Sequence, residues 1–430
     1  MFAVFLILDC QKAAMKQRPE LEQIRSDPAL DELGEVPFAF EELFFSRTNE
    51  KGHILSGNDV FQRVSLYSWD ELLRKPHNVI RHPDMPRAVF WLLWKTIEKG
   101  EPIGAYVKNK AKDGRYYWVY AIVTPIEGGY LSVRLKPSTK IFAAVEKAYA
   151  SLVAMERSSR CKPAESAKLL LETLATLGFR DYGAFAAASL SQEVAARDSK
   201  IGRAPDDTAA YFDELSHAAE GLLTQAASIF EAYAKNRYVP LNLQVQAAQL
   251  GETGATIGVI SNNYVVLSED IKSRMNEFIT SAEQVYATVN QGLFLICTAK
   301  IQGEMVELFE KAVPSDGASR DEEMPYLELQ QKTYRQSAVE GLHAIETQAQ
   351  RFHQSCVEMK RLAAGLEVTR IMGKIESSRL AVSQESLNQL INDLEGFQIS
   401  LAESLKEIDH MNRRIEKNIQ HLLSASAARG

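Results

Sequence analysis

The hydrophobic pattern of this chain of 430 residues changes at Pro137, and that change constrains the fold more than any other feature. Before Pro137, short apolar runs of strand length alternate with turn-forming residues. After it, strand signals largely vanish, and from about residue 205 the pattern is almost entirely helical and rich in Ala, Gln, Glu and Leu. We therefore expect an α+β domain with an antiparallel sheet and flanking helices, followed by an all-α helical bundle or coiled-coil region.

Five runs before Pro137 have the composition of β-strands, and they span 42–48, 53–56, 103–111, 116–125 and 130–135. Helices are expected at 58–64, 69–73 and 87–99. Turn residues at 49–52, 113–114 and 128–129 separate neighbouring strands, so those strands are expected to form hairpins.

Two of these elements indicate which faces are buried. Apolar residues of the helix at 87–99 recur at three- and four-residue spacing, which places Phe90, Leu93, Trp94 and Ile97 on one face. The strand at 116–125 is apolar on both faces, which predicts core on one side and a helix or partner on the other.

The segment 76–86 concentrates polar side chains between prolines: two histidines, an arginine, an aspartate and an asparagine. Its prolines argue against any helix through the middle. Polar groups held in a stiff turn beside apolar segments suggest the wall of a ligand site. The alternative is a capped turn, in which Asp84 caps a helix beginning near Met85 or Pro86.

Composition and charge exclude several classes of protein. The net charge of −7 indicates no nucleic-acid footprint. The four cysteines lie far apart, at Cys10, Cys161, Cys297 and Cys356, so neither a disulfide framework nor a zinc site is indicated. No Ser/His/Asp, paired-carboxylate or metal-ligand spacing stands out, and no GxGxxG fingerprint occurs. We therefore expect a protein that is not an enzyme and has no metal site.

The N-terminus and the apolar runs predict a cytoplasmic protein. No apolar stretch approaches the roughly 20 residues that a membrane span needs. The apolar start at residues 1–8 lacks a preceding basic region and a clear cleavage site, so a signal peptide is not expected. Residues 1–14 read as a mis-called start before Met15 or as a disordered extension.

Six motifs follow one another through the first half, at 44–48 (FFSRT), 57–61 (GNDVF), 77–86 (HNVIRHPDMP), 107–110 (VKNK), 113–119 (DGRYYWV) and 129–134 (GYLSVR). Together they resemble the PAS domain of bacterial aerotaxis receptors, over about residues 40–137. The resemblance implies a pocket that holds FAD, whose redox state reports oxygen or respiratory status. The flavin-binding positions that it carries over are Asn58, Arg81, His82, Asp84, Trp94 and Asn109.

Elementary chemistry agrees with this assignment. An arginine or histidine can donate charge-assisted hydrogen bonds to a pyrophosphate. The amides of Asn58 and Asn109 can both donate to and accept from an isoalloxazine, and Trp94 can supply an aromatic wall.

Each of these positions also has a structural alternative. Asn58 is suited to cap a helix, Asn109 to satisfy a sheet edge and Trp94 to fill the core. Arg81 and Asp84 are able to pair on the surface. His77 is expected to be structural.

Two departures from the family pattern are expected to reshape the pocket: Leu66 stands where glycine is frequent, and Ile103 where some members carry tryptophan. Haem is the main competing cofactor, with His53, His77 and His82 as candidate axial ligands. A light-driven flavin adduct is excluded, because no cysteine lies between residues 11 and 160.

The second half carries a weaker resemblance. Residues 242–254 look like the hairpin tip of a methyl-accepting chemotaxis receptor, and the match keeps Asn242, Ala247, Ala248, Gly251, Glu252 and Gly254. Gln246 and Gln249 replace the Glu and Arg with which that family contacts partners. The fragment 375–380 has the charged pair but no following glycine turn. The alternative is a helical bundle of coincidentally similar composition.

These observations predict five segments: an N-terminal extension, partly disordered, at 1–37, a PAS sensor domain at 38–137, connecting helices at 138–204, a receptor-tip-like hairpin at 205–313 and a C-terminal helical bundle at 326–430. The leading hypothesis is a soluble homodimeric transducer that signals to a chemotaxis histidine kinase and coupling protein. The alternatives are a cofactor-free PAS scaffold for dimerisation and a haem-based gas sensor.

Overall fold

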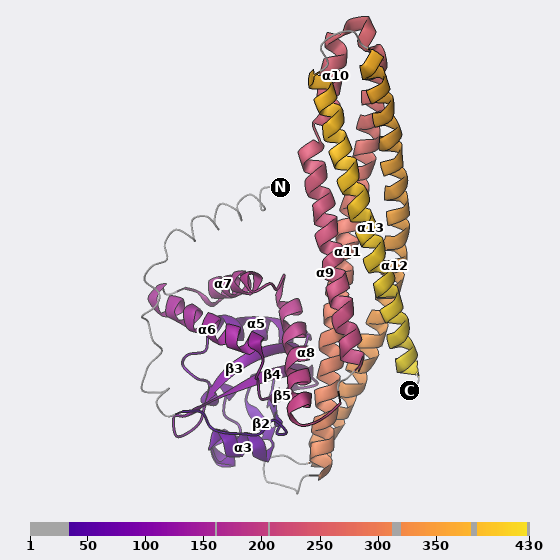
Figure 1. Ribbon diagram of the computed structural model, residues 1–430. Helices are drawn as coiled ribbons and strands as arrows, with labels where there is room; N and C mark the ends of the chain where they lie inside the picture. Colours follow the sequence, from indigo (N-terminus) through magenta and orange to yellow (C-terminus); the bar gives the residue numbers. More distant parts are fainter. Residues whose placement is uncertain (1–33, 160, 205–206, 312–319, 380–384, 428–430) are drawn as a thin grey trace. The chain divides into compact units, whose positions relative to one another are not determined.

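The computed structural model describes residues 34–159, 161–204, 207–311, 320–379 and 385–427 (Figure 1). The chain divides into two compact units. Unit 1 holds the described residues up to Tyr182, together with Ala196–Arg203 and the described part of Glu304–Leu327. Unit 2 holds Gly183–Ala195, the described part of Ala204–Gly303 and the described residues from Glu328 onward. The predicted extension before residue 34 lies outside the described residues.

Unit 1 is built around a five-stranded antiparallel sheet in the order β2-β1-β5-β4-β3. The strands are β1 (Phe44–Asn49), β2 (Ile54–Gly57), β3 (Ile103–Lys110), β4 (Tyr116–Ile126) and β5 (Gly129–Leu135). The five predicted strands are confirmed, with small shifts at their ends. Because β1 pairs with β5, the first and last strands of the domain lie side by side at its centre.

The turn between β4 and β5 depends on two glycines. Gly128 has a φ of +75°, which side chains other than glycine rarely adopt. A Cβ atom on Gly129 would lie 1.9 Å from the carbonyl oxygen of Thr48, so only glycine allows β5 to approach β1 at this point. The predicted hairpin turn is therefore also the point at which the two central strands meet.

Four short elements lie between β2 and β3: α3 (Asp59–Ser65), α4 (Trp69–Leu72), the 3-10 turn η2 (His77–Ile80) and α5 (Arg87–Ile97). The prediction that no helix crosses the segment 76–86 is wrong in one detail, since η2 forms there. A single 3-10 turn fits because Pro76 precedes it and Pro83 follows it, so neither proline removes an internal hydrogen bond.

The cap of α5 also differs from the prediction, because Asp84 does not cap it. The N-cap residue is Pro86, whose side chain cannot accept a hydrogen bond. Instead, the carboxylate of Glu156 accepts from the backbone N–H of Arg87 at 2.9 Å and of Ala88 at 3.2 Å. A residue far along the chain thus satisfies the first turn of α5 and places negative charge at its positive end.

Glu156 belongs to α6 (Lys140–Ser159), the helix that follows the sheet. α6 packs on the face of the sheet opposite α5: its Phe142 ring lies 5.5 Å from the Tyr106 ring and 5.3 Å from the Trp118 ring, centroid to centroid. This cover explains why β4 is apolar on both faces. α7 (Pro163–Thr176) and α8 (Tyr182–Lys200) follow.

Unit 1 also includes the described residues 304–311 and 320–327, from which Phe309 and Glu323 contact β1. The Phe309 ring packs edge-on against the Phe45 ring at 5.0 Å between centroids. The Arg47 guanidinium donates two hydrogen bonds to the buried Glu323 carboxylate, at 2.8 and 2.9 Å. Alternate β1 residues thus face these helix ends, while Ser46 and Thr48 face the other side of the sheet.

Unit 2 is a bundle of long helices, as predicted (Figure 1). It contains α9 (Asp207–Asn236), α10 (Val239–Gln249), the 3-10 turn η3 (Gly251–Gly254), most of α11 (Ala255–Lys311), most of α12 (Arg320–Arg379) and α13 (Glu385–Ala427). Among the described helices, none combines the length and apolar character that crossing a membrane requires.

The helical pattern of the sequence is interrupted near Pro240, at Gly251–Gly254 and at residues 314–325, which predicts three helix breaks. α9 ends just before Pro240, and η3 separates α10 from α11. A Cβ atom on Gly254 would lie 2.2 Å from the carbonyl oxygen of Ala247, so this hairpin turn requires glycine. The third predicted break, at residues 314–325, lies partly outside the described residues. α11 ends at Lys311 and α12 starts at Arg320, so Pro325 lies inside α12.

Candidate ligand-binding cavity

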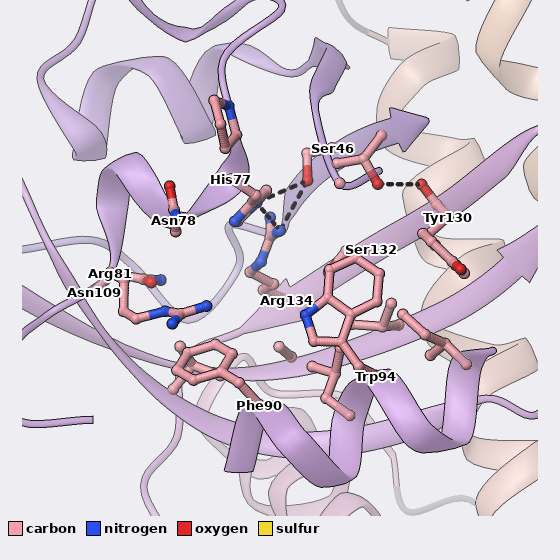
Figure 2. A pocket seen from close by; sticks show the side chains of 18 of the residues that line it. Ser46, His77, Asn78, Arg81, Phe90, Trp94, Asn109, Tyr130, Ser132 and Arg134 are labelled. Atoms are coloured by element: carbon pink, nitrogen blue, oxygen red, sulfur yellow. Dashed lines mark hydrogen bonds between the residues drawn. The ribbon is translucent and has the colours of Figure 1, made fainter. Parts of the chain in front are cut away.

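A cavity of about 210 Å³ lies between α5, the segment that starts at Pro76 and the inner face of the sheet (Figure 2). Its lining consists of Ser46, Thr48, Lys51, Gly52, Pro76, His77, Asn78, Arg81, Phe90, Leu93, Trp94, Ile97, Val107, Asn109, Ala121, Val123, Tyr130, Ser132 and Arg134. The strands contribute alternate residues, because successive side chains of a strand point to opposite faces.

One wall of the cavity is apolar and aromatic. It is the predicted stripe of α5: Phe90, Leu93, Trp94 and Ile97. The Trp94 ring lies edge-on to the Tyr130 ring at 5.6 Å between centroids, and it packs so closely on Gly52 that a Cβ there would come within 3.1 Å. Such a wall suits a flat aromatic ligand.

The opposite end of the cavity holds a polar cluster of Ser46, His77 and Arg134 (Figure 2). The Arg134 Nη2 donates to Ser46 Oγ at 2.8 Å and lies 2.7 Å from His77 Nε2. His77 must accept this hydrogen bond, so its ring is neutral. Burial, together with the charge of Arg134, lowers the pKa of His77 to about 3.

Arg134 carries a positive charge that no carboxylate balances. Its side chain is buried, with the residue 4% exposed, and among the described residues no Asp or Glu lies within ion-pairing distance. Burial lowers the pKa of Arg134 to about 10, so it stays protonated at neutral pH. Its Nη1 atom and the Ser132 Oγ are buried without a hydrogen-bond partner among the described residues. Because buried polar atoms are nearly always hydrogen-bonded, these two mark a place for ligand atoms.

The rest of the lining adds positive charge and no negative charge. Lys51 and Arg81 also border the cavity, and none of its lining residues is Asp or Glu. The Arg81 guanidinium lies over the Phe90 ring, 3.6 Å from its centroid. The cavity therefore favours a ligand that combines an aromatic or apolar body with electron-rich or anionic groups.

The structure brings Arg81, Trp94 and Asn109 together in the cavity lining. Arg81 and Asn109 are paired through an isolated antiparallel bridge between the segment that ends at Pro86 and β3. Asn109 is 3% exposed, so its amide faces the cavity rather than water. Whether these residues bind a flavin stays a prediction.

Asn58 lies outside the lining, and its side chain makes three hydrogen bonds elsewhere. Its Oδ1 accepts from the backbone N–H of Phe61 at 3.2 Å and of Phe45 at 3.0 Å, and its Nδ2 donates to the Leu43 carbonyl at 2.8 Å. Asn58 is the N-cap of α3, the alternative that the sequence left open.

His82 and Asp84 also lie outside the lining. His82 is fully buried. The Asp84 carboxylate lies 2.9 Å from Arg157 of α6 and 3.5 Å from Lys108 of β3. Asp84 therefore ties the proline-rich segment to the helix after the sheet, and it does not pair with Arg81 as the surface alternative supposed. Among the described residues, no group of His, Cys, Asp or Glu is placed to hold a metal ion.

Sequence reasoning missed Ser46, Ser132 and Arg134, and it expected His77 to be structural, or a haem ligand in the alternative. One signal was available: Ser132 and Arg134 alternate with apolar residues in a strand that reads as buried. Polar residues at inward-facing strand positions are uncommon and often serve a ligand.

Comparison with known proteins agrees with the fold described above. Residues 54–132 match the family model for the PAS fold. These residues form part of a PAS domain. The aerotaxis receptor of Escherichia coli (strain K12) is 43% identical over 130 residues, which is 29% of this chain and 26% of the receptor. The nitrogen fixation regulatory protein of Klebsiella pneumoniae is 28% identical over 81 residues, which is 19% of this chain and 16% of that protein.

Two solved structures are also similar to the PAS domain. The PAS domain of a protein from Colwellia psychrerythraea is 18% identical, with a TM-score of 0.20, over 26% of this chain and 97% of that one. A light-oxygen-voltage domain studied with a flavin analogue is 21% identical, with a TM-score of 0.22, over 29% of this chain and 93% of that one. The chain spans only about a quarter of the aerotaxis receptor and less of the nitrogen fixation regulator. What the whole relatives do therefore enters as a proposal.

Proposed function

We propose that the PAS cavity binds FAD, that the redox state of this flavin is the signal, and that the helical unit passes the signal to chemotaxis-type partners without catalysis by this chain. The observation that carries the proposal is the cavity itself: an aromatic wall faces a positively charged, carboxylate-free end. The domain that contains it resembles an aerotaxis receptor at 43% identity over 130 residues.

The lining fits the parts of a flavin. The Trp94 and Phe90 wall matches the flat ring system, while Asn109, Ser132 and Arg134 offer polar partners for its edge. A volume of about 210 Å³ is too small for a whole dinucleotide, so the ring system alone would enter. The exposed Lys51, Asn78 and Arg81 would meet the pyrophosphate outside. When bound, FAD supplies the redox chemistry.

Haem fits the cavity less well. Of the three candidate ligands, His77 alone borders the cavity, and its Nε2 already accepts from Arg134 at 2.7 Å. His53 and His82 are outside the lining. The remaining alternative is a cofactor-free scaffold. It does not explain why the domain buries the charge of Arg134 without a counter-ion.

Contacts with α6 provide a route out of the cavity. The Glu156 carboxylate holds the start of α5, whose middle forms the aromatic wall. The next residue, Arg157, holds Asp84 in the segment that also carries Arg81. A ligand that shifts either wall would therefore move α6 or break its contacts.

The hairpin end of unit 2 offers a surface for partners. Exposed apolar side chains gather there: Tyr238, Leu241, Val245, Val259 and Val266 near the hairpin, and Val368, Ile371, Met372 and Ile375 on α12. α11 and α12 run side by side in this region, since Gly365 lies against Leu267 and Gly373 against Ile260. Exposed apolar patches of this kind mark binding surfaces. A second copy of the chain, a histidine kinase and a coupling protein are the partners we propose.

The absorption spectrum of the purified full chain, before and after heat release, tests the cofactor. Bands at about 370 and 450 nm, with FAD in the supernatant, are the expected result. Arg81→Ala should lower the FAD content, whereas Arg63→Ala, an equal charge change at an exposed position of α3, should not. A Soret band would point to haem, and a colourless protein that takes up no added FAD would overturn the proposal.

A further inference from the structure

The Arg134 guanidinium lies in a setting that usually destabilises a fold. An isolated buried cation loses its hydration, and proteins tolerate one only where an anion or a dense set of acceptors compensates it. Arg134 has neither among the described residues: Ser46 and His77 both accept from the single nitrogen Nη2, and Nη1 has no partner.

The groups around Arg134 cannot become its counter-ion. His77 accepts a hydrogen bond as a neutral ring. Tyr117 is the phenol whose negative charge would act on Arg134. Burial raises the pKa of Tyr117, so it stays protonated and uncharged. The Phe61 ring lies 5.6 Å from the guanidinium carbon and supplies only the weak attraction of an aromatic face. The described neighbours of Arg134 thus supply no negative charge, and the cavity that it borders is where a ligand can supply one.

We propose that Arg134 binds a negatively charged, electron-rich part of the cavity ligand, so that the domain binds the anionic form of that ligand more tightly than the neutral form. This inference rests on the proposed function. Oxidised isoalloxazine is neutral, and the uptake of two electrons and one proton turns it into a mono-anion. A fixed cation beside the ring favours that mono-anion. Through Arg134, reduction of the flavin then makes the free energy of its binding to the domain more favourable.

His77 acts here as a positioning residue. Its Nε2 and the Ser46 hydroxyl fix the direction of Nη2, and the Phe61 ring stacks on the imidazole with centroids 5.9 Å apart and planes inclined by 2°. The guanidinium is planar, so fixing Nη2 also fixes the direction of Nη1. The free donor is thus held in place before the ligand arrives.

The test compares the affinity of the full chain for oxidised and reduced FAD. Dithionite supplies the two electrons under anaerobic conditions, and redox dyes in equilibrium with the flavin give its potential. Arg134→Met should lower the preference for the reduced form at least tenfold, which lowers the two-electron potential by about 30 mV. Arg134→Lys, which keeps the charge, should retain most of the preference. Arg63→Met, which removes the same charge at an exposed position of α3, should leave it unchanged.

The flavin-free protein provides a second readout. If Arg134 serves the ligand, Arg134→Met removes an unpaired buried charge, and the flavin-free variant should melt at or above the temperature of the wild type. A clear drop in its melting temperature would instead assign Arg134 a structural role and overturn the inference.

The outcomes separate the inference from the function on which it rests. A wild type that binds no FAD in either state ends both. A wild type that binds FAD, while Arg134→Met weakens both forms equally or neither, ends the inference and leaves the flavin proposal standing.

Discussion

Two buried arginines in different regions of the molecule show how a structural charge differs from one that awaits a ligand. Arg197 of α8 and Arg134 of the cavity are 2% and 4% exposed. Arg197 pairs with the Glu304 carboxylate and donates to the carbonyl oxygens of Phe40 at 2.7 Å and Glu41 at 3.2 Å, so each of its nitrogens has a partner. Arg134 has two neutral acceptors on one nitrogen. The hydrogen bonds of Arg197 are thus made within the protein, whereas Arg134 Nη1 has no partner among the described residues and is available to a ligand.

Removing the paired arginine should have the largest effect on stability. Arg197→Met leaves Glu304 buried without its closest partner, and we expect a loss of about 3 kcal/mol in the free energy of unfolding. Denaturant titration of the flavin-free protein would measure this loss. Arg203→Met is the matched control, because Arg203 pairs with the same carboxylate but is half exposed, so its loss should be below about 1 kcal/mol. Equal losses in Arg197→Met and Arg134→Met would contradict the comparison.

The pH dependence of unfolding should report the neutral partner of Arg134. Since the pKa of His77 is about 3 in the fold and about 6.5 when unfolded, the unfolded chain binds the extra proton. The contribution of neutral His77 to the free energy of unfolding is therefore fully present above pH 6.5. It declines as the pH falls from there toward 3. At pH 5 the loss is about 2 kcal/mol. Unfolding curves of His77→Gln from pH 7 to 4 should lack this component, and an unchanged pH profile would show that His77 does not carry it.

The carboxylate that caps α5 should have an intermediate effect. Glu156→Gln keeps the size of the side chain but removes its charge and one of its acceptor oxygens, and we expect a loss of about 1 kcal/mol. Amide hydrogen exchange should then speed up in the first turn of α5. Glu146→Gln, at an exposed position of the same helix, is the control and should leave exchange in α5 unchanged.

An arginine with an exposed partner should have the smallest effect. Arg274 of unit 2 contacts Glu358 at 3.0 Å, and the two side chains are 43% and 41% exposed. Arg274→Met should cost about 0.5 kcal/mol or less by thermal unfolding, because water screens such pairs. A loss as large as that of Arg197→Met would show that burial of the partner does not decide the outcome.

Local patterns predicted much of the fold, while contacts between distant residues decided the rest. The strands, the stripe of α5 and the glycine turns follow from neighbouring residues, so sequence was enough for them. Asn58 looked equally suited to a cap and to a ligand, and only the position of Phe45 against it distinguishes the two. Arg134 and His77 lie far apart in the chain, and their contact depends on the register of β5 with β1. No local pattern shows that Glu156 caps α5.

Because Glu156 caps α5, the α+β domain extends beyond its sheet. The helix that walls the cavity starts on an acceptor from α6, and the Ser166 hydroxyl of α7 in turn hydrogen-bonds to the same Glu156. A fragment cut after Pro137 would retain every strand yet lack the group that completes α5. The unit that can be exchanged between proteins, or grafted onto a new output, therefore extends through α7 and ends near Thr176.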